Sequence, residues 1–154
     1  MTDYTLLTEQ LSALAADEPH WLPVLANAAA LLWESLPEIN WAGFYLMHRD
    51  SLLLGPFQGK VACIRIARGR GVCGTAAAED KTQLVPDVHA FPGHIACDSA
   101  SRAEIVVPLH SGGRVVGVLD IDSPREGRFT EADRRGLERF ARTLEEVTAW
   151  GASL

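Results

Sequence analysis

The sequence predicts an α+β domain in which helices cover both faces of an antiparallel β-sheet. Apolar residues recur at helical spacing across residues 5–36 and again near the C-terminus, and the runs between them have the two-residue alternation of strands. The turn at Ser111–Gly113 separates two β-rich runs and is a strong hairpin signal. Residues 41–47 are apolar on both strand faces, which is typical of a central strand covered on each side.

The composition is that of a globular protein. The chain has 154 residues, 47% of them hydrophobic and 22% charged, so we expect one domain spanning residues 1–154. The net charge of −6 argues against nucleic acid or an anionic membrane as the main partner, because both need a basic surface. No apolar run approaches the ~20 residues that cross a bilayer, and the N-terminus does not read as a secretory signal. We therefore expect a cytoplasmic protein.

Residues 5–36 predict two helices. In the first, leucines recur at helical spacing from Leu7 to Leu14, until Asp17–Pro19 interrupt the pattern. A second apolar stripe of the same spacing follows, and Pro37 ends that helix, because the residue before a proline is disfavoured in helical conformation.

Three strands are expected next. Residues 41–47 and 51–58 alternate as strands and would pair as a hairpin across His48–Asp50. A third short strand is expected over Ala62–Ile66, and it contains Cys63.

A glycine-rich turn, Gly69–Gly71, leads into a short alanine-rich helix. This helix carries Cys73 near its N-terminus, where the helix dipole favours a thiolate. A short strand over residues 82–85 follows. The stretch Val88–Glu104 is then too rich in turn-forming residues to be a regular element. A long loop inside a compact domain is usually functional or mobile.

The last part of the chain predicts a hairpin and a helix. Residues 103–110 and 114–122 are the strands of the hairpin. The segment Thr130–Asp133 fits a capping box and opens a C-terminal helix whose apolar stripe ends at Val147.

Three acidic side chains are expected to converge at one end of the sheet. Asp120 and Asp122 lie two residues apart on a predicted strand, so both point to the same face. Glu104 starts the partner strand, and the turn pairs it roughly with Asp120. Like charges that close cannot all stay ionised cheaply, so at least one pKa should be raised, which suits a general acid beside a cation-binding acid pair. The alternative is that all three are ordinary surface or turn residues.

Cys97 is the best candidate for a reactive thiol, because burial as a small apolar filler is less natural in a loop. An unperturbed thiol is only a few per cent ionised near neutral pH, so it needs activation. His94 would help if its segment turns helically, or it has no role. Cys63 and Cys73 are either resolving thiols or buried fillers, and three cysteines do not suggest a disulfide framework.

The residues predict no bound metal or cofactor. The chain has no C-x₂-C pair of the kind found in structural zinc sites, and its glycines match no phosphate-binding loop. Trp41 and Tyr45 share one strand face, where they either wall a pocket for an apolar or thioether group or belong to the core.

Seven motifs between about Asn40 and Phe140 occur together in one known family. They are Asn40–Tyr45, Gly59–Ile64, Gly69–Ala77, Val85–Val88, Phe91–Asp98, Ser101–Pro108 and Val118–Ser123. With these motifs the chain resembles a GAF domain, and specifically the free methionine-(R)-sulfoxide reductases. All three cysteines fall at the family's positions, which makes the match more specific than one to GAF domains in general.

The resemblance implies a six-stranded antiparallel sheet, helices on both faces and a closed ligand cavity. The implied substrate is free L-methionine-(R)-sulfoxide, not methionine sulfoxide within proteins. Cys97 would attack the sulfoxide sulfur and become a sulfenic acid. Cys63 is the implied resolving thiol, with Cys73 as the alternative, and thioredoxin would reduce the resulting disulfide.

The resemblance also implies roles for the pocket residues and an assembly. Trp41 and Tyr45 match an aromatic wall against the thioether end of the substrate. Glu104, Asp120 and Asp122 match acids that bind the sulfoxide oxygen and the amino group. A homodimer is expected by the same analogy. The alternative functions are a GAF-type small-molecule-binding module and a thiol redox sensor without a substrate.

Overall fold

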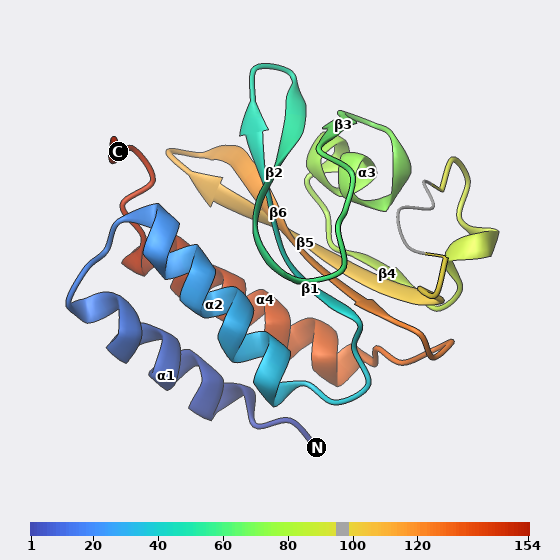
Figure 1. Ribbon diagram of the computed structural model, residues 1–154, viewed down its shortest axis with the longest axis horizontal. Coiled ribbons are helices and arrows are strands. Elements are labelled where there is room, and N and C mark those ends of the chain that lie inside the picture. The colour runs from blue at the N-terminus through green and yellow to red at the C-terminus, as the bar shows by residue number, and fades with distance from the viewer. Residues whose placement is uncertain (95–98) are drawn as a thin grey trace.

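A six-stranded antiparallel sheet forms the centre of the computed structural model, which describes residues 1–94 and 99–154 (Figure 1). Its strands are β1 (Trp41–His48), β2 (Ser51–Gly59), β3 (Arg65–Ala67), β4 (Gln83–Val85), β5 (Ala103–Ser111) and β6 (Arg114–Ser123). They lie in the order β3-β2-β1-β6-β5-β4, and every pair is antiparallel. Both edge strands, β3 and β4, are three residues long. The predicted fold class is confirmed.

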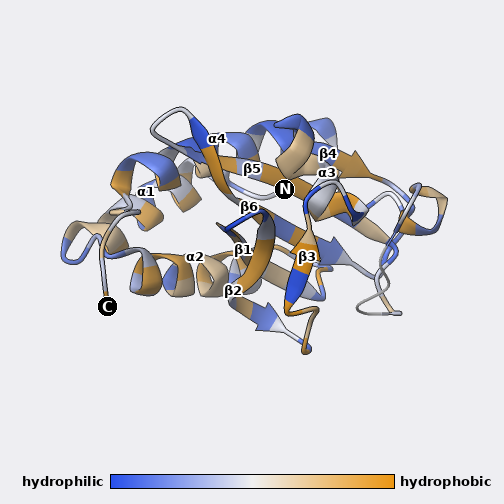
Figure 2. Ribbon diagram, turned by 90° about the horizontal axis from the view of Figure 1, so that it is seen from above, coloured by the Kyte–Doolittle hydropathy of each residue, from blue (hydrophilic) through white to orange (hydrophobic). Residues whose placement is uncertain are grey.

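Four helices cover the two faces of the sheet. They are α1 (Tyr4–Ala16), α2 (Trp21–Ser35), α3 (Gly71–Glu79) and α4 (Glu131–Val147), with a 3₁₀ turn η1 (Val88–Ala90) before β5. Helices α2 and α4 pack on one face, with α1 lying outside them against both, and α3 alone packs on the other face (Figures 1 and 2). In the part of the chain that the structure describes, no helix combines the length and apolar character needed to cross a bilayer.

Alternation along β1 divides the core into two layers. Phe44 points to the larger core, where it packs with Leu119 and Phe140 between the sheet and the three-helix layer; all three are fully buried. Tyr45, the next residue, points to the smaller core beneath α3, together with Trp41. The sheet is therefore anchored on one face by a large apolar core, which leaves the α3 face free to carry polar groups.

The third strand begins later than its sequence predicts. The expected strand over Ala62–Ile66 is observed only as Arg65–Ala67, and Cys63 lies in the irregular segment before it. Continuing the β2–β3 register would place Pro56 opposite Ala62. The ladder ends with the Leu53–Arg65 pair and a last bond from Leu54 N to the carbonyl of Ile64, and Pro56, which has no N–H to donate, cannot extend it.

The register of the β5–β6 hairpin differs from the predicted one by two residues. Glu104 pairs with Asp122 and not with Asp120. The turn contains two residues, Gly112–Gly113, and an irregularity after Leu109 shifts the ladder by one more position. A bulge of this kind arises from local twist and is not visible in the alternation of apolar residues.

His110, on β5, ties α3 to α4. Its ring nitrogens lie 2.5 Å from Asp80, the C-cap of α3, and 2.7 Å from Glu145 on α4. Burial alone would lower the pKa of His110, but the hydrogen bonds and charges of these two carboxylates raise it above the ordinary value. His110 thus bridges two acids, which favour its protonated form, and holds the C-terminal end of α3.

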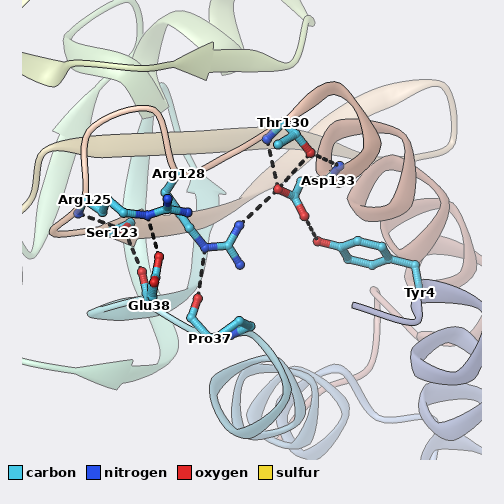
Figure 3. Close-up of polar contacts among 8 residues, drawn as sticks. All are labelled: Tyr4, Pro37, Glu38, Ser123, Arg125, Arg128, Thr130 and Asp133. Atoms are coloured by element: carbon cyan, nitrogen blue, oxygen red, sulfur yellow. Dashed lines mark hydrogen bonds and ion pairs between the residues drawn. The ribbon is translucent and has the colours of Figure 1, made fainter. Parts of the chain in front are cut away.

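A buried polar network joins the N-terminus, α4 and the turn before β1 (Figure 3). Arg128 is 7% exposed; its Nη1 donates to Asp133 Oδ2 at 3.1 Å and its Nε donates to the carbonyl of Pro37 at 3.0 Å. Asp133 also accepts a hydrogen bond of 2.8 Å from Tyr4 Oη. With Thr130 it forms the predicted capping box, which is confirmed. This network sets where the chain enters β1.

We expect the substitution Asp133→Asn to destabilise the fold by about 3 kcal/mol, because it leaves the buried Arg128 without its anionic partner. Burial alone would raise the pKa of Asp133, but hydrogen bonds from Thr130 and Tyr4 and the charge of Arg128 hold it below its ordinary value. Its contribution is therefore complete above the ordinary pKa of about 3.9 and is lost as the pH falls through the lower folded pKa.

Urea denaturation of the wild type and of Asp133→Asn, from pH 7 down to pH 3, measures the difference in their free energies of unfolding. The difference should shrink at the acidic end. The exposed Glu131, on the first turn of the same helix, supplies the matched control Glu131→Gln. A constant difference across this pH range would contradict the assignment.

Candidate active site

A pocket opens between the sheet and α3, on the face opposite the three-helix layer. Its walls come from β1, β5, β6, the first turn of α3 and residues 61–62. The lining residues are Trp41, Tyr45, Val61, Ala62, Ile66, Arg70, Gly71, Val72, Cys73, His94, Ser101, Glu104, Asp120 and Asp122. All six candidate site residues that the sequence placed on β1, α3, β5 and β6 therefore share one pocket.

The aromatic wall is a stack on β1 and β2. Trp41 lies between Tyr45 and Phe57, with ring centroids 5.9 Å and 5.1 Å away and interplanar angles of 21° and 14°. Its indole N–H donates to the carbonyl of Lys60 at 3.1 Å. Gly59 has φ +131°, and a Cβ there would approach Trp41 Cδ1 to 2.7 Å. A glycine is thus required where the backbone passes the indole.

The carboxyl cluster is built by the β5–β6 ladder. Glu104 lies directly opposite Asp122, and Asp120 comes two residues earlier on β6, so all three reach the α3 side. Glu104 is 8% exposed and Asp120 is 5% exposed. The predicted convergence is confirmed, and the alternative that these are surface residues is wrong for Glu104 and Asp120.

Burial and mutual repulsion set the protonation of the cluster. Burial, followed by the charges of Asp120 and Asp122, raises the pKa of Glu104 well above its ordinary value. Burial also raises the pKa of Asp120, although its hydrogen bonds within the cluster lower it in part. The arrangement therefore favours the protonated form of Glu104. Burial and the same acids raise the pKa of Tyr45 as well, so its phenol stays neutral.

Cys73 is part of this cluster. Its Sγ lies 3.9 Å from Glu104 Oε2 and its side chain is 5% exposed. Burial, with the charges of Asp120 and Glu104, raises the pKa of the thiol well above its ordinary value. The expectation that the dipole of α3 favours a thiolate here is wrong, because desolvation and neighbouring acids outweigh a helix dipole effect worth at most about 2 kcal/mol.

The other two cysteines lie outside α3, in the segments before β3 and before β5. Cys63 packs against the smaller core, half-buried, and its carbonyl accepts a hydrogen bond of 2.8 Å from Tyr45 Oη. This bond anchors the irregular segment beside the aromatic wall. Cys97 belongs to residues 95–98, which lie outside the described part of the chain. His94, just before them, lines the pocket.

Two pocket residues were missed by sequence reasoning. Arg70 lies in the glycine-rich turn and lines the pocket as the N-cap of α3. Ser101 is 6% exposed and its Oγ accepts a hydrogen bond of 3.1 Å from the side chain of Asn40. Neither has a periodic signal, because both lie in loops that the fold alone brings to the pocket.

The first turn of α3 presents backbone N–H groups to the pocket. Among the described residues, no side chain caps this helix end, although Arg70, Gly71, Val72 and Cys73 all line the pocket. Uncapped N–H groups and the positive end of the helix dipole favour an anion. The pocket therefore has an acidic side on the sheet and an anion-binding side on α3.

The family of the chain follows from its similarity to known proteins. A family model described as GAF domain matches residues 9–147. The chain belongs to the GAF domain family.

Individual relatives and solved structures show to which group within the GAF domain family the chain belongs. The chain is 56% identical over 146 residues to the free methionine-R-sulfoxide reductase of Escherichia coli, covering 95% of this chain and 88% of the relative. A structure of fRMsr of Staphylococcus aureus in complex with substrate has 49% identity, a TM-score of 0.92 and 97% coverage of both chains. The free methionine-R-sulfoxide reductase of Neisseria meningitidis in complex with its substrate has 48% identity and a TM-score of 0.91, covering 96% of this chain and 89% of that one. This GAF-domain chain is thus a member of the free methionine-R-sulfoxide reductases, an enzyme family, and the resemblance drawn from its motifs is confirmed.

We expect Cys73 to react slowly with alkylating reagents. In a Cys63→Ser/Cys97→Ser variant it is the sole thiol, and its burial and raised pKa leave little thiolate. Iodoacetamide labelling at pH 8, followed by mass spectrometry, should be at least about tenfold slower than for free cysteine, because each unit of pKa shift lowers the thiolate fraction about tenfold. Labelling in urea is the control. Equal rates in the folded and unfolded states would contradict the described environment.

Proposed function

We propose that the protein reduces free L-methionine-(R)-sulfoxide to L-methionine through a cysteine sulfenic acid and a disulfide that thioredoxin reduces. One observation carries the proposal: a buried carboxyl cluster and an aromatic wall lie side by side on one face of the sheet and line a single pocket. The relatives crystallised with their substrate at 48–49% identity support the same substrate class.

The pocket offers a partner for each end of a free amino acid. An ionised acid of the Asp120/Asp122 pair binds the ammonium group, and the first turn of α3 binds the carboxylate. The methyl thioether end then rests against Trp41 and Tyr45. A methionine sulfoxide within a protein has neither charged group, because both are in peptide bonds. Preference for the free amino acid follows from this division of the pocket.

Glu104 is suited to act as the proton donor. The thiolate of Cys97 attacks the sulfoxide sulfur and forms a sulfur–sulfur bond, while a proton from Glu104 converts the sulfoxide oxygen to a hydroxyl group. The hydroxyl then passes to the Cys97 sulfur as the sulfur–sulfur bond breaks, and the electron pair of that bond returns to the sulfur of the departing methionine. The products are methionine and the sulfenic acid of Cys97, so the sulfur of the substrate is reduced and that of the cysteine is oxidised. Because Glu104 is buried among other acids, it keeps its proton near neutral pH and can supply it.

Cys63 is better suited than Cys73 to resolve the sulfenic acid. Attack on the sulfenic sulfur by a second thiol forms a disulfide and releases the oxygen as water. Cys73 is almost fully buried and its raised pKa makes it a weak nucleophile. Cys63 lies in an irregular segment next to the pocket residues Val61 and Ala62. A disulfide between Cys63 and Cys97 would then be accessible to thioredoxin.

The activity is tested with thioredoxin, its reductase and NADPH, by following NADPH oxidation. We expect turnover with free L-methionine-(R)-sulfoxide, and at least about a hundredfold less with the S epimer or with N-acetyl methionine sulfoxide amide, because a site built for polar groups strongly rejects ligands that lack or misplace them. No turnover with the free R epimer would sink the proposal and favour a binding module or a thiol sensor.

Cysteine variants separate the roles of the three thiols. We expect Cys97→Ser to be inactive, and Cys63→Ser to release about one methionine per enzyme before it stalls without a resolving thiol. Cys73→Ser is the matched comparison and should continue to turn over. Mass-spectrometric mapping of the disulfide after one turnover checks the pairing. A Cys73–Cys97 disulfide would transfer the resolving role to Cys73.

Replacing the proposed proton donor should affect catalysis more than binding. We expect Glu104→Gln to lower kcat by about 10²- to 10⁴-fold, the usual contribution of a general acid. The donor must be protonated, so wild-type kcat should fall as the pH rises through the raised pKa of Glu104. Glu104→Gln should lack this alkaline limb. Retention of the limb in the variant would assign it to another group.

The remaining expectations stay predictions. A homodimer is proposed by analogy with the family, and a cytoplasmic location is an expectation from the sequence alone. Analytical ultracentrifugation of the purified chain addresses the first directly.

A further inference from the structure

Three metal-ligand groups meet in the pocket beneath α3. They are the Sγ of Cys73 and one carboxylate oxygen from each of Glu104 and Asp120, and these atoms all lie within 4.8 Å of one another. Each of the three residues is at least nine-tenths buried, with exposures of 5%, 8% and 5%. They come from three separate elements, α3, β5 and β6, so the fold itself assembles the set.

A second observation points to a ligand at the same place. Oδ1 of Asp120 is buried and has no hydrogen-bond partner among the described residues. Buried polar atoms in native proteins are nearly always satisfied, and exceptions often belong to sites that bind an ion or another ligand. Asp120 also lines the pocket, so a bound group can reach it.

The donor set selects the kind of ligand. One thiolate and two carboxylates suit Zn²⁺ and its heavier congener Cd²⁺, whereas Mg²⁺ and Ca²⁺ prefer oxygen alone. Zinc–ligand bonds of about 2.3 Å to sulfur and 2.0 Å to oxygen, at tetrahedral angles, separate sulfur and oxygen by roughly 3.5 Å. Cys73 Sγ and Glu104 Oε2 are 3.9 Å apart, which is within a small side-chain adjustment of that value.

We propose that Cys73, Glu104 and Asp120 bind a thiophilic divalent cation, Zn²⁺ or Cd²⁺, when the pocket holds no substrate. Binding forms three coordinate bonds, with no change of oxidation state. The proton of the thiol and any proton held by the two carboxyl groups leave to solvent, so affinity rises with pH. Solvent supplies a fourth ligand.

The bound cation excludes the substrate. It neutralises the acids that would bind an ammonium group and removes the proton from Glu104. This consequence rests on the proposed function, whereas cation binding itself does not. Cation binding is therefore measured directly, apart from any activity.

The test uses the full chain with Cys63→Ser and Cys97→Ser, so that Cys73 is the sole thiol. Titration with CdCl₂ at pH 7.5, in a buffer that does not chelate metals, is followed by the ultraviolet thiolate-to-cadmium absorbance. We expect saturation at one equivalent, and loss of the absorbance when Cys73→Ser is added. Absence of this absorbance in the double variant would overturn the proposal.

Matched acid substitutions on the same background identify the carboxylate ligands. Asp120→Asn should weaken cadmium binding at least tenfold, and Glu131→Gln, which removes an exposed acid far along the chain, should leave it unchanged. Thermal melting checks that each variant is folded, and Glu104→Gln provides a second ligand variant. Equal affinity in Asp120→Asn, Glu104→Gln and Glu131→Gln would overturn the site.

Competition between the cation and the substrate tests whether they occupy the same pocket. L-methionine-(R)-sulfoxide should raise the apparent Kd for Cd²⁺ in the double variant at least tenfold at saturating concentration, and EDTA should reverse Zn²⁺ inhibition of the wild-type enzyme. Cadmium binding without competition would refute the exclusion of substrate but not the metal site. A wild-type enzyme inactive in EDTA would refute the proposed function and leave the cadmium result standing.

Discussion

The cross-strand pairing of Glu104 with Asp122 is the constraint on which the site depends. Like-charged residues directly opposite each other destabilise a sheet, and desolvation adds to the cost because Glu104 is buried. Two features offset this. The raised pKa of Glu104 favours its neutral form, which removes one charge. The other face of the same strands packs into the larger core, where residues such as Ile105 and Ile121 are almost fully buried. Apolar burial on one face of the sheet therefore offsets the destabilising effect of the buried acids on the other face.

The short helix α3 is held at both ends, which keeps the pocket roof fixed over the acids. At its start, Gly69 N donates to the carbonyl of Gly74 at 2.8 Å, and a Cβ at Gly74 would approach the carbonyl of Ala67 to 2.6 Å. At its end, Asp80 binds His110. Helices of this length have little stability of their own. These two attachments therefore determine where Cys73 and the free N–H groups lie.

Much of the fold could be predicted from the sequence because its elements are strongly periodic and their ends carry recognisable signals, such as the capping box at Thr130. The convergence of three acids was predictable as well, since strand alternation decides which face a side chain occupies. Details that depend on the packing of neighbouring elements could not be predicted from the sequence. The two-residue turn and the bulge after Leu109 together moved the partner of Glu104 by two positions. The ionisation of Cys73 depends on acids distant in sequence, and the helix dipole alone gave the wrong direction.

The two edge strands have an architectural consequence. Each has only three residues, so neither presents a long row of unpaired backbone groups to another chain, and edge-to-edge aggregation has little template. Short edge strands also affect the loop segments attached to them. Residues 60–64 run between β2 and an edge strand held by three pairs, and not between two strands of the central ladder. Rearranging this segment would leave the four inner strands and their core unchanged. The segment that carries Cys63 is thereby kept apart from the central ladder, and sequence change in this segment can proceed without unfolding the sheet.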